Sequence, residues 1–204
     1  TFRIMEEEPE RLAEVKGISM RKALEISGAV AGKRDLRQAM LFLQQYGITQ
    51  NLGMKIYNFY QGRLYQVIRE NPYKLADDID GVGFRIADEI ASKAGILPDS
   101  DFRIRSGILY VLEQATGQGH TCLPMDQLMQ EARRLLGVEI DSMNDRIMDL
   151  IMDKKIVVKT KEDIQMVYSS VSYYTELMIA QMLKDLNIKD TITSDEIAAK
   201  IKTI

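Results

Sequence analysis

The sequence predicts a mainly α-helical fold in two parts, and three observations lead to that fold class. A short phrase that begins with glycine occurs three times in the first half of the chain. Apolar residues recur at helical intervals, for example at Leu36, Met40 and Leu43. Residues 155–168 instead hold two short β-prone runs with a turn between them. We therefore expect helices through most of the chain and one small β-hairpin.

The repeated phrase consists of glycine, an aliphatic residue and a small residue, followed at fixed distances by a second small residue and isoleucine. Its copies are Gly17-Ile18-Ser19 with Ala23 and Ile26, Gly47-Ile48-Thr49 with Gly53 and Ile56, and Gly81-Val82-Gly83 with Ala87 and Ile90. Glycine adopts backbone angles that other residues avoid, so each copy suits a tight bend between two helices. This pattern is the signature of a helix-hairpin-helix, and its recurrence predicts a tandem helix-hairpin-helix domain over residues 1–98.

Glycines and prolines divide the first domain into the short helices that such an array needs. The expected breaks include Gly28 and Gly32, which lie between the first and second copies. A polar segment, Pro98-Asp99-Ser100-Asp101, then marks a boundary, so that residues 99–204 form a second domain.

The second domain begins with an amphipathic helix over residues 102–116. Pro124 opens another helix, which Gly137 stops, and a third helix begins near Ser142. A hairpin follows, with runs 155–159 and 164–168 on either side of Thr160-Lys161-Glu162-Asp163. Helix, helix and β-hairpin in this order resemble a winged-helix module. Further helices are expected from Ser172 to about Leu186 and from the capping box of Thr193 and Glu196.

The composition is that of an ordinary globular protein, with 46% hydrophobic and 28% charged residues. The sequence has no apolar run long enough to cross a bilayer and no secretory signal pattern, so we expect no membrane association and a cytoplasmic location. The single cysteine, Cys122, cannot form an internal disulfide. Because residue 1 is Thr, we expect the sequence to be a piece of a longer protein.

The charge distribution favours the first half for binding a polyanion. The net charge is -3, but residues 1–98 carry +1 and residues 99–204 carry -4. In a helix-hairpin-helix, the second helix starts directly after the bend, so its unpaired N–H groups and its dipole attract an anion. Such main-chain contacts reach the sugar-phosphate backbone and read no bases. They also need few positive side chains, which suits a chain of negative net charge.

The three copies differ in their suitability for DNA. The first copy has Lys16, Arg21 and Lys22 around its bend, and we expect it to bind a phosphate. The third copy has a better glycine pattern and Arg85, but three carboxylates precede it, at Asp77, Asp78 and Asp80. The middle copy has only Lys55 nearby, which favours a packing role. The predicted DNA-binding residues are Lys16, Gly17, Ile18, Ser19, Arg21, Lys22, Gly81, Val82, Gly83 and Arg85. The alternative is that all three glycines serve only to let helices pack closely.

The sequence offers no catalytic group and no metal site. His120 is the only histidine, and no serine or cysteine stands in a nucleophile motif. The P-loop pattern G-x-x-x-x-G-K-[ST] does not occur, so the chain by itself should not hydrolyse ATP. Aspartates 77 and 80 could in principle bind a metal in a nuclease built on helix-hairpin-helix units, but both precede a phosphate-type bend, which argues against that use.

Several stretches resemble the N-terminal region of RecD-like ATP-dependent DNA helicases, the RecD/TraA family. They are Asn71-Pro72-Tyr73-Lys74-Leu75, the run 79–88, the run 105–112, Gly119-His120-Thr121-Cys122-Leu123-Pro124, Val167-Tyr168 and Tyr174-Thr175-Glu176. The resemblance covers nearly the whole chain. Two positions depart from the hairpin pattern, because Ser19 replaces the second glycine of the first copy and Asp80 precedes Gly81.

The resemblance implies that this chain is the accessory region of a 5′-3′ helicase whose two motor domains lie elsewhere in the same polypeptide. It implies single-stranded or forked DNA as a partner, ATP and Mg as cofactors of the motor, and a role in DNA repair and recombination. Two functions stay open at this point. The region either holds the DNA backbone through hairpin N–H groups, or it docks the motor and other proteins without touching DNA.

Overall fold

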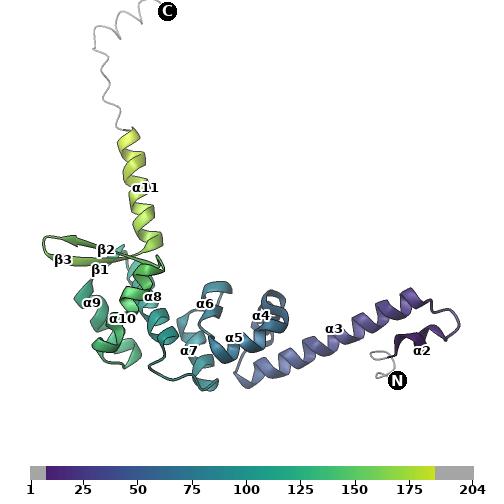
Figure 1. Ribbon diagram of the computed structural model, residues 1–204. Helices are drawn as coiled ribbons and strands as arrows, with labels where there is room; N and C mark the ends of the chain where they lie inside the picture. Colours follow the sequence, from purple (N-terminus) through teal and green to yellow (C-terminus); the bar gives the residue numbers. More distant parts are fainter. Residues whose placement is uncertain (1–7, 187–204) are drawn as a thin grey trace, which may run out of the picture. The chain divides into compact units, whose positions relative to one another are not determined.

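The computed structural model describes residues 8–186 and is mainly α-helical, as the sequence predicts (Figure 1). The helix expected from Thr193 lies outside the described residues. The chain divides into two compact units, Thr1–Ser106 and Gly107–Ile204. The division falls inside a helix that begins at Asp101, directly after the polar segment at 98–100. Each unit is described separately below.

The first unit is entirely helical among its described residues. Its elements are α2 (Pro9–Ala13), α3 (Met20–Gln45), α4 (Gln50–Tyr60), the 3-10 turn η1 (Gln61–Arg63), α5 (Leu64–Glu70), α6 (Lys74–Asp78), α7 (Phe84–Lys93) and the first part of α8 (Asp101–Gly117). Its core is formed by aliphatic side chains with no more than 2% exposure, which come from five consecutive helices: Leu43, Ile56, Leu64, Ile68, Leu75 and Ile90.

Helix α3 is longer than the sequence suggests, because neither Gly28 nor Gly32 breaks it. It runs without interruption over 26 residues, which is roughly 39 Å at the usual helical rise. A glycine within a helix costs only about 1 kcal/mol, and the alanines around these two glycines favour the helix. A Cβ added at either glycine would meet nothing within 4 Å, so packing does not require glycine there. The expectation of short helices in this stretch is therefore wrong.

Two tyrosine–aspartate pairs fix the helices near the third repeat. Tyr60 Oη donates to Asp78 Oδ2 at 2.6 Å, which joins α4 to α6. Tyr73 Oη donates to Asp88 Oδ1 at 2.6 Å, and the guanidinium of Arg103 donates to both oxygens of the same carboxylate at 2.8 and 3.1 Å. The second group joins the start of α6 and α7 to α8. Both tyrosines are buried, so these bonds form where water does not compete well.

The second unit combines helices with a small antiparallel sheet. It contains the rest of α8, β1 (Cys122–Pro124), α9 (Met125–Leu136), α10 (Ile140–Met152), β2 (Ile156–Lys161), β3 (Ile164–Ser169) and α11 (Ser170–Leu186). The expected hairpin is confirmed as β2 and β3, and the residues between them, Glu162 and Asp163, both have positive φ, as a two-residue type I′ turn requires. The sheet order is β1-β3-β2, so β1 adds a third strand that the sequence did not predict.

The core of the second unit lies between α8, α9, α10 and the sheet. Its buried side chains include Ile108, Leu128, Met143, Leu150 and Val167. Gly107 on α8 permits close packing, because a Cβ there would lie 2.6 Å from Cδ2 of Leu136 on α9. None of the helices of the described residues 8–186 is both long and apolar enough to span a membrane.

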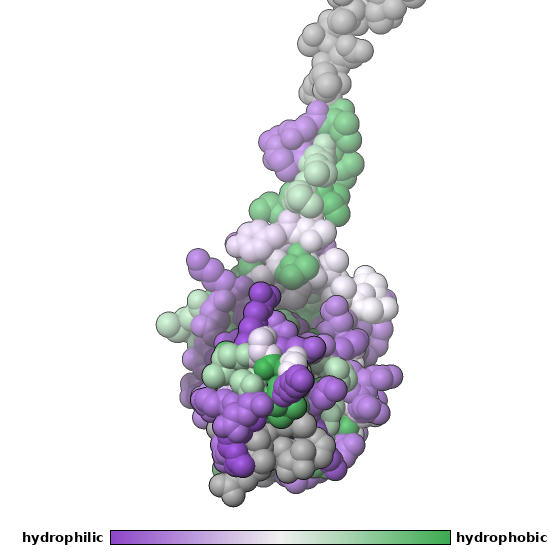
Figure 2. Space-filling model, turned by 90° about the vertical axis from the view of Figure 1, so that its right-hand side faces the viewer, coloured by the Kyte–Doolittle hydropathy of each residue, from purple (hydrophilic) through white to green (hydrophobic). Residues whose placement is uncertain are grey.

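Helix α11 differs from the other helices of this unit because its apolar side chains remain outside the core. It follows β3 directly and projects from the sheet (Figure 1). Seven aliphatic or methionine side chains along it are between 48% and 79% exposed, namely Val171, Leu177, Met178, Ile179, Met182, Leu183 and Leu186. Figure 2 shows much of the visible face of this helix as hydrophobic. Helix α11 therefore presents an apolar surface that no other part of the described chain covers.

The two tyrosine–aspartate pairs should make folding stability sensitive to high pH. Burial raises the pKa of both Tyr60 and Tyr73 above the ordinary value. The hydrogen bond of Tyr60 to Asp78 and that of Tyr73 to Asp88 raise it further. The unfolded chain releases these protons near pH 10 while the folded chain retains them, so the free energy of unfolding should fall as the pH rises above about 10. Urea unfolding between pH 8 and pH 11 measures this decline.

The double variant Tyr60→Phe/Tyr73→Phe should be less stable at pH 8, by about 1 kcal/mol per lost hydrogen bond, and its stability should decline less above pH 10. Tyr57→Phe, on α4 three residues before Tyr60, is the matched control and should keep the wild-type decline. An identical decline in the double variant would contradict this account.

Candidate nucleic-acid interface

All three repeated glycines occupy left-handed backbone positions between helices. We call the turns bend 1, bend 2 and bend 3, centred on Gly17, Gly47 and Gly81. Their φ angles are +95°, +78° and +91°. An L-residue with a side chain is disfavoured in this region by about 1 kcal/mol or more. The repeat therefore marks three helix-hairpin-helix bends, which connect α2 to α3, α3 to α4, and α6 to α7.

The three bends are of two kinds. In bends 1 and 3 the residue after glycine closes a four-residue turn, with Ile18 N donating to Val15 O at 3.0 Å and Val82 N to Ile79 O at 3.1 Å. In bend 2 the N–H of Ile48 reaches back to Leu43 O at 3.3 Å, which is the Schellman ending of a helix. The backbone thus makes bend 3 a closer match to bend 1 than to bend 2.

The other repeat positions serve packing. The aliphatic residues after the glycines of bends 2 and 3, Ile48 and Val82, are each 5% exposed. The second small residue is buried in every copy, at Ala23, Gly53 and Ala87, and Gly53 lets Met40 Sδ approach to 3.1 Å of where a Cβ would be. The packing alternative therefore describes these side chains well, and Val82 could face DNA only through its main chain.

The cap positions separate bend 1 from bend 3. Ser19 caps α3, and its Oγ accepts a hydrogen bond from Lys22 N at 3.3 Å. Gly83 occupies the corresponding position before α7 and has no side chain to accept such a bond. In α3 the Lys22 N–H is bonded to the side chain of Ser19, whereas the corresponding N–H in the first turn of α7 has no such side-chain acceptor. Gly83 is itself exposed. Bend 3 offers more main-chain donors to an outside anion than bend 1.

The charges around bend 3 are more favourable than the sequence suggests. Asp78 turns its carboxylate toward Tyr60, with which it is hydrogen-bonded. Lys55 on α4 donates from Nζ to the main-chain oxygen of Asp80 at 3.1 Å, so a cation lies beside the bend from 25 residues away. Arg85 in the first turn of α7 is exposed. Asp77 and Asp80 remain at the surface. Compared with what the sequence shows, bend 3 thus has one carboxylate fewer facing outward, that of Asp78, and one cation more, Lys55.

Bends 2 and 3 lie side by side. Residues of both bends, including Gly47, Thr49 and Gly81, line one pocket of about 410 Å³, together with Lys55. Lys93 on α7 donates from Nζ to the main-chain oxygen of Tyr46 at 3.1 Å. Each bend thus receives a lysine from the second helix of the other hairpin. These two contacts place the two bends at one surface of the first unit.

Bend 1 is separated from that surface by the length of α3. It precedes the first residue of α3, and bend 2 follows the last, so roughly 39 Å of helix lies between them. The cations of bend 1, Lys16, Arg21 and Lys22, are exposed, and Arg21 pairs with Glu25 at 3.2 Å. The ten predicted DNA-binding residues therefore form two groups, one at each end of α3, and the structure does not bring them together.

The structure contains a fourth bend that the repeat did not reveal. Gly95 has φ +79°, and Ile96 N donates to Ala91 O at 3.0 Å, which reproduces the Schellman ending of bend 2. Ser100 Oγ then accepts from Arg103 N at 3.3 Å at the start of α8. The Gly95-Ile96 pair matches the first two positions of the repeat, but the proline at 98 and the longer loop obscured the rest.

Acidic groups near the bends do not form a metal site. In residues 8–186, no group of three or more His, Cys, Asp or Glu side chains is arranged to hold a metal ion. Asp77 and Asp80 thus have no third ligand of these types among the described residues. The surface around bends 2 and 3 is equipped to bind an anion through main-chain N–H groups and nearby cations.

A comparison with known protein families agrees with this geometry. Residues 32–122 match the family model described as the ATP-dependent RecD2 DNA helicase HHH domain. The match includes bends 2 and 3 and the fourth bend at Gly95, and it begins after bend 1. The resemblance noted in the sequence is thereby confirmed for this stretch: residues 32–122 are similar to the helix-hairpin-helix domain of RecD-like DNA helicases.

Proposed function

We propose that this chain is the accessory DNA-binding region of a RecD-like 5′-3′ helicase and that it holds the sugar-phosphate backbone without regard to sequence. The observation that supports this most is bend 3, where an uncapped helix start, Arg85 and Lys55 occur together. Its position within the matched family region, 32–122, gives the same surface a DNA-processing context. The DNA would be single-stranded or forked, and the protein would act in the cytoplasm.

The proposed contact at bend 3 depends on the main chain. Gly83 has φ -96° and ψ 176°, and a Cβ there would meet no atom within 4 Å, so the space beside the helix start is open. A phosphate in that space would accept hydrogen bonds from the first N–H groups of α7 and would lie at the positive end of the helix dipole. Arg85 and Lys55 add positive charge. Gly81, Val82, Gly83 and Arg85 are the residues of this contact.

Bend 1 would supply a second contact of a different kind. Ser19 already uses one N–H of α3, so the affinity there would come mainly from Lys16, Arg21 and Lys22. Gly17 and Ile18 shape the bend. Cations of this sort contribute a salt-dependent attraction to any phosphate backbone. Bend 1 and bend 3 would therefore contact separate segments of the DNA.

The domain division is also a proposal, with a tandem helix-hairpin-helix domain over residues 1–98 and a winged-helix-like domain over 99–204. If the second domain is winged-helix-like, its helix α10 does not suit DNA. Aspartates recur at four-residue intervals from α10 into its C-cap and therefore lie along one side of this helix, at Asp141, Asp145, Asp149 and Asp153. Arg146 lies 3.5 Å from Asp149 and 3.9 Å from Asp145, so one cation offsets part of this charge. The remaining negative charge would repel a phosphate backbone from that side. Contacts to the phosphate backbone are accordingly assigned to the bends of the first domain.

Catalysis would belong to the motor domains of the same polypeptide. In the proposed arrangement those domains bind ATP and Mg, and this region keeps the DNA in place during translocation. The proposal includes roles in DNA repair and recombination.

A second function, docking of the motor or another protein, is favoured by one observation. The apolar side chains of α11 are exposed, although an isolated apolar helix surface is unfavourable in water. We propose that α11 packs against the motor domains. This use is compatible with DNA binding at the bends, because the two surfaces belong to different units.

Exchanging the cap residues of bends 1 and 3 tests the main-chain contact. Gly83→Ser should place an oxygen that accepts the Ile86 N–H, as Ser19 does for Lys22, and so remove one donor from the DNA. Affinity for a mixed-sequence oligonucleotide should fall roughly tenfold, since a hydrogen bond to a charged group contributes about 1.5 kcal/mol. Fluorescence anisotropy at low salt measures the affinity, and thermal unfolding should show no loss of stability because the site is open and extended.

The reverse exchange, Ser19→Gly, frees a donor at bend 1 and should tighten binding by about twofold while costing a few tenths of a kcal/mol in stability. Gly62→Ser, at an exposed glycine with open space around it, is the matched control and should change nothing. Wild-type affinity in Gly83→Ser would reject the main-chain contact.

Removing the cations of bend 1 tests the second contact. The Lys16→Ala/Arg21→Ala/Lys22→Ala variant should weaken binding and lower the slope of log K against log salt by as much as about 2 to 3, because each phosphate contact contributes about 0.9 to that slope for duplex DNA. The control variant Lys33→Ala/Arg34→Ala/Arg37→Ala removes the same charge from α3 roughly 20 Å farther along the helix. Equal slopes in the two variants would exclude bend 1 as a specific contact.

Polar substitutions on α11 test docking. The Leu177→Gln/Met182→Gln/Leu183→Gln variant should bind the purified motor region of the helicase at least tenfold more weakly in isothermal titration calorimetry, because it removes three exposed apolar side chains. Its DNA affinity should equal that of the wild type. Glu176→Ala/Gln181→Ala/Lys184→Ala, on exposed polar positions of the same helix, is the control. An unchanged affinity for the motor would remove α11 as its docking surface.

A further inference from the structure

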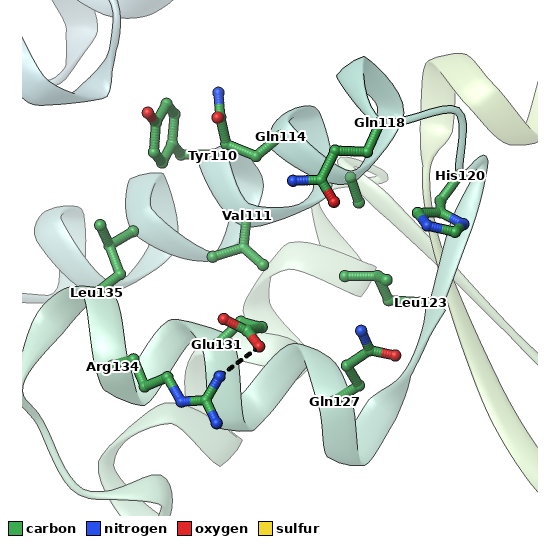
Figure 3. Close-up of a pocket in the computed structure, with 11 residues that line it drawn as sticks. Tyr110, Val111, Gln114, Gln118, His120, Leu123, Gln127, Glu131, Arg134 and Leu135 are labelled. Carbon is green, nitrogen blue, oxygen red and sulfur yellow. Dashed lines mark hydrogen bonds and ion pairs between the residues drawn. The ribbon is translucent and has the colours of Figure 1, made fainter.

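The second unit contains a pocket that the hairpin function does not use. It has a volume of about 430 Å³ and lies between α8 and α9, with β1 at one end. A volume of this size is within the range of pockets that hold small organic groups. The pocket opens to solvent, so a group carried on a longer chain could enter between the side chains that line it (Figure 3).

The walls of the pocket carry uncharged amides around an apolar centre. Gln118, in the turn directly after α8, and Gln127 on α9 extend toward the space between the two helices, and Gln114 stands on the α8 rim (Figure 3). Val111 and Leu123 lie between the amides, and both are no more than 8% exposed. Each amide supplies two N–H donors and an acceptor oxygen. The pocket therefore suits a flat apolar group with donors and acceptors at its edge.

The charged groups of the pocket largely compensate one another. Arg134 Nη1 lies 2.8 Å from Glu131 Oε1, so this cation and this anion form an ion pair within the lining. A free phosphate or a metal ion would find no excess of opposite charge there. His120 and Tyr110 at the rim add an aromatic surface on each of two sides (Figure 3).

We propose that this pocket binds an unstacked nucleobase of single-stranded DNA. A base has polar edges that glutamine amides can pair with and faces that Val111, Leu123 and an aromatic ring can contact. The inference rests on the proposed function, since that function brings single-stranded or forked DNA to the chain. It adds a contact that the bends cannot make, because main-chain contacts to phosphates do not distinguish an exposed base from a paired one.

A peptide segment is the other occupant that amide walls could accept. The second unit has a negative net charge, so it attracts DNA less than a basic surface would. The pocket itself has no dominant charge, which suits a neutral base whose phosphates remain in solvent. A base also fills the space between two helices as one rigid, flat group. A peptide would have to order several residues to cover the same area, which costs conformational entropy.

Two oligonucleotides that differ only in their bases test the proposal. The full chain is titrated by fluorescence anisotropy with a mixed-sequence single-stranded 15-mer and with a 15-mer of abasic tetrahydrofuran sites. The wild type should bind the base-containing strand about five- to tenfold more tightly, since one base stacked in a protein contributes about 1 kcal/mol or more. Gln118→Ala/Gln127→Ala should reduce that ratio to near one and should leave the abasic strand unaffected.

Gln130→Ala/Gln165→Ala, which removes two exposed glutamines outside the pocket, is the matched control and should keep the wild-type ratio. As an independent measurement, adenosine and thymidine are titrated into the isotope-labelled full chain. Amide resonances of α8 and α9 should shift in the wild type and not in Gln118→Ala/Gln127→Ala.

These measurements separate the two proposals. Loss of DNA binding in Gly83→Ser with an unchanged base-to-abasic ratio in Gln118→Ala/Gln127→Ala overturns the pocket alone. Nucleoside shifts at α8 and α9 without any effect of Gly83→Ser support the pocket and reject the hairpin contact. An absence of nucleoside shifts overturns the pocket proposal.

Discussion

The structure of the first unit depends on left-handed glycines placed where one helix ends and the next must begin in a new direction. Gly17, Gly47, Gly81 and Gly95 all have φ between +78° and +95°. A side chain at any of these positions would meet the steric penalty of the left-handed region, whatever space surrounds it. Because the turn is short, the residue after the glycine can enter the core while the next helix starts at the surface. One backbone requirement thus determines both the packing of the unit and the exposure of its helix starts.

The lysines at bends 2 and 3 follow from this constraint. A helix that ends at a glycine leaves carbonyl groups with a partial negative charge, and Lys93 meets that charge at the end of α3, where it donates to the oxygen of Tyr46. Lys55 has the corresponding relation to the oxygen of Asp80. Both lysines are exposed, so their remaining donors face solvent. The contacts that hold the two hairpins together also bring positive charge to both bends, including bend 3, which the sequence shows beside acidic residues.

Local features of the sequence predicted local features of the structure, and long-range contacts were the ones missed. The glycine positions, the helix over 102–116 and the β2–β3 hairpin depend on residues close in sequence, and all are present. The continuity of α3 was missed because helix propensity outweighs two isolated glycines. Strand β1 has only three residues and exists through pairing with β3, as in Leu123 opposite Val167. Nothing within such a short segment distinguishes it from a loop.

The candidate site shows the same limit. The repeat identified the bends, and the sequence showed the better glycine pattern of the third copy, but it placed the expected phosphate contact at the first copy. The direction of Asp78 and the reach of Lys55 depend on partners 18 and 25 residues away, so the charge around bend 3 could not be read from its neighbours in sequence. The fourth bend, at Gly95, has the same main-chain hydrogen bond as bend 2 but matches only the first two positions of the sequence repeat, so the sequence did not reveal it.

The distribution of charge restricts how a nucleic acid could use these surfaces. Residues 99–204 carry -4, and the aspartates at four-residue intervals along α10 concentrate part of that charge on one side of the second unit. A phosphate backbone would be repelled there, whereas an uncharged base is indifferent to the field to first order. The first unit has the opposite properties. Its bends offer N–H donors to phosphates, but the apolar side chains of bends 2 and 3 are buried and cannot contact a base. Attraction of the backbone by one unit and tolerance of a neutral base by the other would favour DNA whose strands are already separated.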